Sequence, residues 1–507
     1  MPEGVSVEVE RKFDVADLDV VPDLTSIPGV GGIRSTGDLA LDAVYFDTPA
    51  LDLAAQGITL RRRAGGKDAG WHLKLPLSSD KRYEVREPLE DEPDTVPLRL
   101  RLLVLAHTRN RELIPVAHLK TRRSPVKILA PDGTVLAEFS DDRVQSTALL
   151  EPVESSAWRE WELELVDGSS KLLAAVAVAF EALGHRPAKY PSKLARALST
   201  RYPADRRSVP RPRAKGPASA VLVSYVDDQV RALKANDPGV RKRDPDSVHQ
   251  LRVAARKIRS ALSSFRSLTD QSQAQSLRDE LQWLAGAVGT ARDLDVMRMR
   301  IAHAIDAEPP GLDTGQARQH LEERLTASFE EAIAQGIAAL SSDRYFQLLD
   351  SLDGFLANPP LSASAHKKSA VKIQGLVNAE LRRLKKAVRF VVVSEEEGLD
   401  GGALHEVRKG AKRLRYAADA AAPIFGKQAT KASRRAQKIQ TILGEHQDSL
   451  VVRERLSSLV QDSPEPGARV GFIYGRLHSL EQQRAAEART KFVRTWRSSP
   501  PKRLHRV

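Results

Sequence analysis

The sequence contains no cysteine, few aromatic residues and no long apolar run. The absence of cysteine excludes disulfides, thiolate catalysis and cysteine-ligated zinc, and is compatible with the cytoplasm. The longest helix-like apolar run, Leu172–Phe180, is far shorter than the ~20 residues that a membrane span needs. The N-terminus, MPEGVSVEVERKF, lacks the apolar core of a signal peptide. We therefore expect a cytoplasmic protein that does not enter a membrane.

Charge is distributed unevenly along the 507 residues. The composition, 41% hydrophobic and 29% charged, is that of a soluble globular protein, and the length indicates more than one domain. Residues 1–200 carry 26 Lys and Arg against 31 Asp and Glu, whereas the remainder carries 53 against 35. An excess of 18 positive charges in one part of the chain indicates that this part meets a polyanion.

The residue pattern changes once along the chain and predicts two domains. Up to about residue 167, short alternating runs separated by turn residues predict β-strands, and a helix is expected over Ser170–Leu183. Residues 201–216, rich in proline and arginine, predict a linker. Helical periodicity then continues almost throughout. We expect a β-rich domain over residues 1–200 and an all-α domain over residues 217–500.

The predicted strands carry whole faces of charged side chains. Because side chains alternate along a strand, residues two apart share a face. The charged faces are formed by Glu8, Glu10 and Lys12; Arg61 and Arg63; His72 and Lys74; Arg82, Glu84 and Arg86; Lys120 and Arg122; Glu138, Ser140 and Asp142; and Glu160, Glu162 and Glu164. A half-solvated antiparallel sheet would also have a polar face. Faces of one sign, however, repel unless a counter-charge offsets them.

The two kinds of charged face predict one kind of ligand. Carboxylate triplets offer oxygen ligands to a hard divalent cation such as Mg²⁺ or Mn²⁺. Arginine and lysine faces suit phosphate. A site that offers both fits a polyphosphate chelated to a metal. His72 is more simply interpreted as a hydrogen-bonding residue than as a phosphate ligand.

The N-terminal 200 residues resemble the CYTH superfamily of triphosphate tunnel metalloenzymes. Glu8-Val9-Glu10-Arg11-Lys12 matches the ExExK signature, and the strands TLRRR, WHLKL, HLKTRR and WREWELEL follow in order, with Ser192-Lys193 near the end. The resemblance implies an antiparallel eight-stranded tunnel barrel with flanking helices, open at both ends and lined by the charged faces. It implies hydrolysis of a terminal phosphoryl group with the help of Mg²⁺ or Mn²⁺.

Roles for individual residues follow from this resemblance. Glu8 and Glu10, with one or more of Glu160, Glu162 and Glu164, are expected to hold the metal. The expected catalytic carboxylates, which would bind a second metal or orient water, are Glu138 and Asp142. The residues expected to bind substrate phosphate are Lys12, Arg61, Arg63, Lys74, Arg86, Lys120, Arg122 and Lys193.

The helical half contains an internal repeat. VHQLRVAARKIRSAL, Val248–Leu262, returns as LHEVRKGAKRLRYAA, Leu404–Ala418, and Val288-Gly289 with Arg292-Asp293 returns as Leu443-Gly444 with Gln447-Asp448. Each repeated helix has an apolar stripe and, beside it, a basic ridge. We expect two copies of one helical unit, over about residues 217–357 and 362–500, related by a pseudo-two-fold axis.

The repeated motif resembles the CHAD domain, the conserved histidine α-helical domain, over about residues 217–500. This resemblance implies binding of inorganic polyphosphate by the repeated helices. The residues expected to bind it are His249, Arg252, Arg256, Lys257, Arg259, His405, Arg408, Lys412, Arg413 and Arg415. A solvated basic face would explain one such helix, but these helices lack the acidic i, i+4 partners of solvated faces. Specific nucleic-acid binding is not expected, because aromatics amount to 5% and do not interleave with the ridges.

Together these features predict a metal-dependent phosphoanhydride hydrolase, acting on inorganic triphosphate or related compounds, joined to a polyphosphate-binding domain. Association with polyphosphate granules is a further expectation. The alternative is a polyphosphate-binding or granule-associated scaffold whose barrel binds phosphate without turnover. An adenylate cyclase is a weaker third hypothesis, since no adenine pocket is evident. Chain-length preference, the preferred metal and the oligomeric state stay open.

Overall fold

The computed structural model divides the chain into two compact units, Met1–Ser208 and Val209–Val507. It describes residues 5–66, 68–76, 81–89, 95–203, 209–309, 311–393, 401–461 and 467–505. The boundary between the units falls within the predicted linker, of which residues 204–208 lie outside the described residues.

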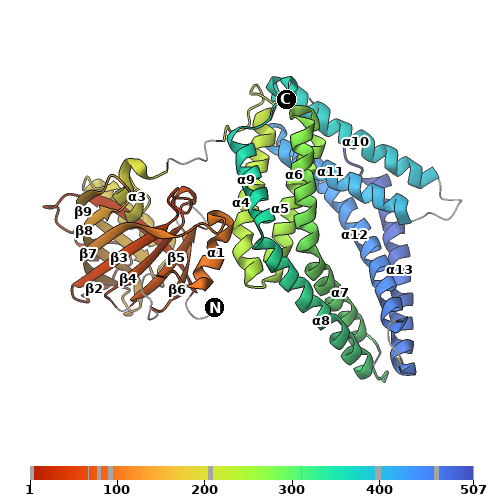
Figure 1. Cartoon of the computed structure of the whole chain (residues 1–507), viewed down its shortest axis with the longest axis horizontal. Coiled ribbons are helices and arrows are strands. Elements are labelled where there is room, and N and C mark those ends of the chain that lie inside the picture. Colours follow the sequence, from red (N-terminus) through yellow and green to blue (C-terminus); the bar gives the residue numbers. More distant parts are fainter. Residues whose placement is uncertain are drawn as a thin grey trace. The chain divides into compact units, whose positions relative to one another are not determined.

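The N-terminal unit is a closed antiparallel barrel of eight strands (Figure 1). Closure is achieved by β1 and β9, where Glu10 pairs with Glu164 and Lys12 pairs with Glu162. Two short strands, β2 (Gly32–Ser35) and β10 (Arg186–Pro187), pair with β7 and β1. Around the barrel the order is β1 (Val5–Val15), β6 (Lys81–Glu87), β5 (Gly70–Pro76), β4 (Thr59–Ala64), β3 (Leu39–Asp47), β7 (Ile114–Leu129), β8 (Val135–Ala148) and β9 (Glu154–Leu165).

Two helices cover apolar side chains on the outside of the barrel. Helix α1 (Leu98–Thr108) packs on outward-facing residues of β4 to β6, among them Trp71 and Leu73. Helix α2 (Ser170–Ala182) packs Phe180 on Phe13 and Trp161. Burial of these outer faces leaves the alternate side chains of the same strands, which are charged, directed inward.

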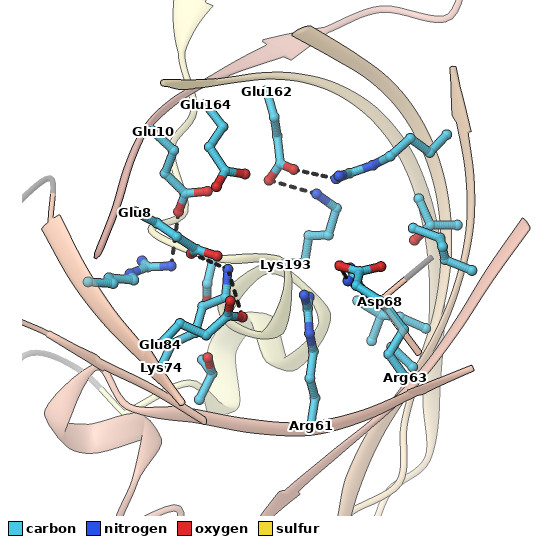
Figure 2. A pocket seen from close by; sticks show the side chains of 18 of the residues that line it. Glu8, Glu10, Arg61, Arg63, Asp68, Lys74, Glu84, Glu162, Glu164 and Lys193 are labelled. Carbon is cyan, nitrogen blue, oxygen red and sulfur yellow. Dashed lines mark hydrogen bonds and ion pairs between the residues drawn. The ribbon is translucent and has the colours of Figure 1, made fainter. Parts of the chain in front are cut away.

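A third helix fills one end of the barrel. Helix α3 (Lys193–Leu198) begins with Ser192, whose side chain accepts a hydrogen bond from the Ala195 N–H. Its Leu194 and Leu198 pack among the inward-facing Tyr45 and Leu119, and the helix lies inside the ring of strands (Figure 2). The expectation of a barrel open at both ends is therefore wrong, because an apolar helix occupies one of them.

The C-terminal unit is helical, as the periodicity predicts (Figure 1). Within the described ranges, no helix is long and apolar enough to cross a membrane. The helices that carry the argument are α4 (Ser219–Arg241), α5 (Pro245–Ser264), α6 (Gln271–Ala287), α7 (Gly289–Asp306), α8 (Gly315–Leu340), α9 (Asp343–Ala357), α10 (Ser369–Val393), α11 (Gly401–Phe425), α12 (Lys427–Gln461) and α13 (Ala468–Ser498).

The two copies of the repeated motif lie on α5 and α11, and these two helices contact each other. Their apolar stripes, with Leu251 and Ile258 on α5 and Val407 and Leu414 on α11, are buried. The copies differ one helix later. The first breaks between α6 and α7 at Val288, whereas α12 runs unbroken through the equivalent position.

Candidate functional site

The barrel encloses a cavity of about 260 Å³ whose walls are mostly charged (Figure 2). Carboxylates gather on the β1 and β9 side, and arginines of β4 lie across from them. Of the residues predicted from the sequence, those that line the cavity are Glu8, Glu10, Lys12, Arg61, Arg63, Lys74, Arg86, Glu138, Glu162, Glu164 and Lys193.

Two predicted phosphate ligands face the wrong way. Lys120 and Arg122 lie on the outside of β7, where both are exposed, and Arg122 pairs with Asp38 at 3.3 Å. The side chains of this strand that face the cavity are instead Leu119, Thr121 and Arg123. The prediction that Lys120 and Arg122 line the cavity is therefore wrong, because inward-facing Leu119 packs with the apolar helix α3 and sets the phase of the strand.

Glu8, Glu10 and Glu164 form an acidic wall at the junction of β1 and β9 (Figure 2). Glu8 is paired with Lys74, and Glu10 accepts a hydrogen bond from Arg82 at 3.1 Å. Glu164 pairs with no cation among the described residues. Burial, and then the charge of Glu8, raise the pKa of Glu164 to about 7. A carboxylate left without a counter-charge beside two others suits a divalent cation.

Asp142, Glu160 and Glu162 form a second acidic group, with ligand atoms within 4.8 Å of one another. The Lys193 ammonium already lies 2.8 Å from one oxygen of each carboxylate. Although burial opposes ionisation, the three carboxylates raise the pKa of Lys193 well above its usual value. We call these four residues the lysine cage. All three carboxylates of the cage share a cation of the chain, whereas the acidic wall contains Glu164, which pairs with no cation among the described residues, so the wall fits a metal better than the cage does.

Asp142 and Glu160 lie behind the cavity surface, where they are almost completely buried. Asp142 accepts two hydrogen bonds from Arg123, at 2.8 and 2.7 Å, and Glu160 accepts one from Trp158 at 2.6 Å. Their contacts hold α3 and β7 in place. The roles predicted for them, catalysis for Asp142 and metal binding for Glu160, stay predictions.

Three arginines converge on the opposite wall. Burial, and then Arg61 and Arg123, lower the pKa of Arg63 to about 9, as expected where cations are crowded without enough counter-charge. The Nε atoms of Arg61 and Arg63 are buried without a hydrogen-bond partner. Arg63 pairs with Asp68 in the β4–β5 turn. Unsatisfied buried N–H groups on crowded cations fit a phosphate with many acceptor oxygens.

Some lining residues were placed on a charged face by the sequence analysis but given no role, and others were not recognised. Glu84, on the inward face of β6, accepts a hydrogen bond from His72 Nδ1 at 2.9 Å and from Arg86 at 2.6 Å. It thereby orients two neighbouring side chains. In the sequence, its inward position is indicated only by its spacing of two residues from Arg86. Arg82 was likewise placed on a charged face without a role, whereas Tyr45, Asp68, Thr121 and Arg123 were not recognised.

Replacing Lys193 with Met should destabilise the barrel. The lysine cage would lose its cation and keep three buried carboxylates, a change that typically costs about 3–5 kcal/mol. Because the pKa of Lys193 is raised, its contribution is fully present below its unfolded pKa near 10.5 and is lost only as pH rises through the folded value. Urea unfolding at neutral pH measures the loss. An unchanged free energy of unfolding with a raised KM would instead assign Lys193 to substrate binding.

The helical unit brings four cations together where α5 contacts α11. Burial, and then Arg408 and Arg256, lower the pKa of Lys412 to about 7. The pKa of Arg256 is lowered by burial and by the neighbouring arginines. We call this group the cation cluster; its members are Arg252, Arg256, Arg408 and Lys412. Buried Nε atoms without a hydrogen-bond partner on its three arginines leave donors for an anion.

The glycines of the repeat have a packing role beside the cluster. A Cβ atom at position 289 would lie 3.0 Å from Nη2 of Arg252, and one at position 444 would lie 3.9 Å from Nη2 of Arg408. Glycine at 289 therefore lets the arginine lie flat on the next helix. There Arg252 donates two hydrogen bonds to Asp293, at 2.8 and 3.1 Å.

The other predicted polyphosphate ligands lie beside different partners and do not converge on one site. His405 Nδ1 lies 3.1 Å from Gln447 Oε1, whereas exposed His249 has Arg292 in the equivalent place, and Arg292 donates to Asp295. Arg413 lies 3.5 Å from buried Glu380 of α10. Of the remaining three, Lys257 is influenced by the charge of Asp419, Arg259 by that of Arg278, and Arg415 donates to Gln440 at 3.3 Å. The cation cluster is thus the part of the predicted set that converges.

The fold and both sites define a triphosphate-tunnel barrel followed by a helical domain of repeated basic helices. A CYTH domain model matches residues 6–197 and a CHAD domain model matches residues 224–457. Two uncharacterized proteins of Mycobacterium tuberculosis are each 39% identical over 500 residues, covering 95% of this chain and 94% of each relative. The chain belongs to the CYTH–CHAD family.

Solved structures resemble each half separately. The CHAD domain from the plant Ricinus communis is 22% identical, with a TM-score of 0.47, and covers 58% of this chain and 96% of its own. The putative adenylyl cyclase HpAC1 from Hippeastrum, described as having a dominant triphosphatase activity, is 14% identical with a TM-score of 0.25, and covers 39% and 98%.

Proposed function

We propose that the barrel hydrolyses the terminal phosphoanhydride of inorganic triphosphate or a related polyphosphate in a metal-dependent reaction, and that the helical unit binds inorganic polyphosphate. The observation that carries the first part is the cavity with opposed walls, carboxylates of β1 and β9 facing arginines of β4 and β7. Walls with this much charge do not suit a small neutral substrate. Arginines on one side and carboxylates on the other suit a phosphate chain that carries a cation.

Each wall has its own task in this reaction. Glu8, Glu10 and Glu164 would hold Mg²⁺ or Mn²⁺, which polarises a phosphoryl oxygen when bound. Arg61, Arg63 and Arg123 stabilise the charge that develops on the equatorial oxygens. Glu138 lines the same cavity and is our candidate for orienting the attacking water. Because phosphoryl transfer depends mainly on positioning and charge stabilisation, no nucleophilic side chain is required.

The cation cluster supports the second part of the proposal. Its three crowded arginines have buried Nε–H groups without a partner, and burial and the neighbouring arginines lower the pKa of Arg256, a cost that a polyanion would offset. A nucleic acid is a less suitable partner, because aromatic residues amount to 5% of the chain and none belongs to the cation cluster.

The direct test measures release of phosphate from inorganic triphosphate by the purified chain with Mg²⁺ or Mn²⁺. Diphosphate and nucleoside triphosphates are tested in the same way as alternative substrates. Release that depends on the metal supports the hydrolase. Absence of release from all of these, with polyphosphate binding retained, would favour the scaffold.

Polyphosphate binding should weaken as pH rises above 7. The pKa of Lys412 is lowered to about 7 in the free protein, and a bound polyanion stabilises its ammonium form, so binding takes up a proton. We expect affinity to fall by up to ~10-fold per pH unit between pH 7 and the pKa of the bound state. Calorimetry in buffers of different ionisation enthalpy measures the proton uptake. Lys412→Arg should flatten the profile, and an equal slope in this variant would contradict the assignment.

A further inference from the structure

A second basic groove lies between α12 and α13, apart from the cation cluster. It has a volume of about 920 Å³ and a floor of Leu450, Ala485 and Val493. Among the described residues that line it there is no carboxylate and no Phe, Tyr or Trp. We call it the arginine groove; its charged residues are Arg453, Arg489, Arg494 and Arg497, and His446 lies beside them, where burial and then Arg489 lower its pKa.

The four arginines of this groove have no acidic partner among the described residues. Arg453 donates instead to Nε2 of His478, at 3.3 Å. The groove between α6 and α9 provides a contrast within the same unit. Its Arg344 donates to both oxygens of Glu280, at 2.8 and 3.1 Å, so that its charge is already neutralised.

The arginine groove and the cation cluster lie on different sides of α12. Gly444 faces Arg408, whereas His446, Leu450 and Arg453 recur at steps of four and three and face α13. At 1.5 Å per residue, the axial separation from Gly444 to Arg453 is about 14 Å. A short anion therefore reaches one of these sites, and a long flexible chain can reach both by passing around the helix.

We propose that the arginine groove is a second binding site for the same polyphosphate chain that occupies the cation cluster, an inference that rests on the polyphosphate binding proposed above. Charge complementarity supports this occupant, because four neighbouring arginines without an acidic partner among the described residues favour an anion with closely spaced charges. Among its described lining residues there is no Phe, Tyr or Trp, the side chains that form the usual stacking platforms for nucleobases, so a phosphate chain without bases is favoured. Occupation of both sites by one chain makes long polyphosphate bind more tightly than short chains.

The test compares full-length wild type with the double variant Arg489→Glu and Arg494→Glu. The matched control is Lys431→Glu with Lys491→Glu, which changes the charge equally at exposed positions outside the groove. Binding of inorganic triphosphate, of long-chain polyphosphate and of single-stranded DNA is measured over a range of salt. We expect the groove variant to lose ~100-fold in affinity for the long chain, about tenfold for each charged contact removed. Its salt slope should fall by about 1.4, at ~0.7 for each contact.

Triphosphate binding by the groove variant should equal that of wild type, and the control should retain tight binding of the long chain. Equal long-chain affinity in wild type and groove variant would overturn the second site while leaving the cation cluster intact. Failure of wild type to bind polyphosphate of any length would instead overturn the proposed function. A variant that loses DNA binding and keeps polyphosphate binding would show the groove to be a nucleic-acid site, which also overturns the proposal.

Discussion

Glu10→Gln is expected to reduce triphosphate hydrolysis by about 10³-fold or more, since a metal's stabilisation of the transition state is worth several kcal/mol. The substitution keeps the shape of the side chain and removes the negative charge from the acidic wall. Lys12 retains Glu162 at 2.8 Å, so the fold should persist. Phosphate release measures the activity, and calorimetric titration with Mn²⁺ measures the loss of the cation.

The matched control for this variant is Glu181→Gln, which makes the same chemical change at an exposed position of α2. It should leave hydrolysis and Mn²⁺ binding unaltered. If Glu10→Gln retained activity within tenfold of wild type, the acidic wall would not be the metal site. The next candidate would then be the lysine cage, where a metal would have to displace Lys193.

The second large effect is expected in the helical unit. Arg252→Glu together with Arg408→Glu should weaken long-chain polyphosphate binding by at least ~100-fold, because two charge-assisted contacts are lost and two repulsive charges are introduced. Asp293 and Asp448 already lie near these positions, so the variant cluster would be strongly acidic. Hydrolysis of triphosphate in the barrel should be unchanged.

Lys385→Glu with Lys386→Glu provides the same change in charge on an exposed part of α10, away from the cluster. Pull-down on immobilised polyphosphate separates the two variants. Equal loss in both would show that binding follows net charge alone, and loss of hydrolysis in the cluster variant would show that the reversal disturbs the protein beyond the binding site.

Much of the barrel could be predicted, because alternation along a strand is a local property. The charged phases of β1, β4, β6, β8 and β9 follow directly from which neighbours are apolar. Strand β3 and helix α1 were not recognised. The inward residues of β3 are Leu41, Ala43 and Tyr45, so it lacks the charged pattern of the others.

Which face of β7 turns inward could not be predicted, since its basic residues, Lys120, Arg122 and Arg123, occur on both faces of the strand. Near the start of β7, Ala117 and Leu119 pack against apolar side chains of helix α3. Residues two apart share a face, so Arg123 faces inward and Arg122 does not. The rule of apolar residues outside and charged residues inside is reversed at that end of the barrel. This reversal depends on a helix that lies more than 60 residues later in the sequence, and a local pattern cannot reveal it.

The helical repeat predicted helices at α5 and α11 and the recurrence of Gly289 as Gly444, but not that these glycines lie beside Arg252 and Arg408. It could not distinguish which basic residues converge, because that depends on the angle at which α5 meets α11. Arg252, Arg256, Arg408 and Lys412 share the contact, whereas Arg413 turns toward Glu380 of α10.

The helix that fills one end of the barrel has a consequence for how a polymer would be degraded. A linear chain could enter only by its terminus and could not thread through, so cleavage would remove units from the end and never from the interior. The released orthophosphate would have to leave by the mouth through which the substrate arrived. Each cycle would then require the shortened chain to withdraw at least partly, which favours distributive over processive degradation.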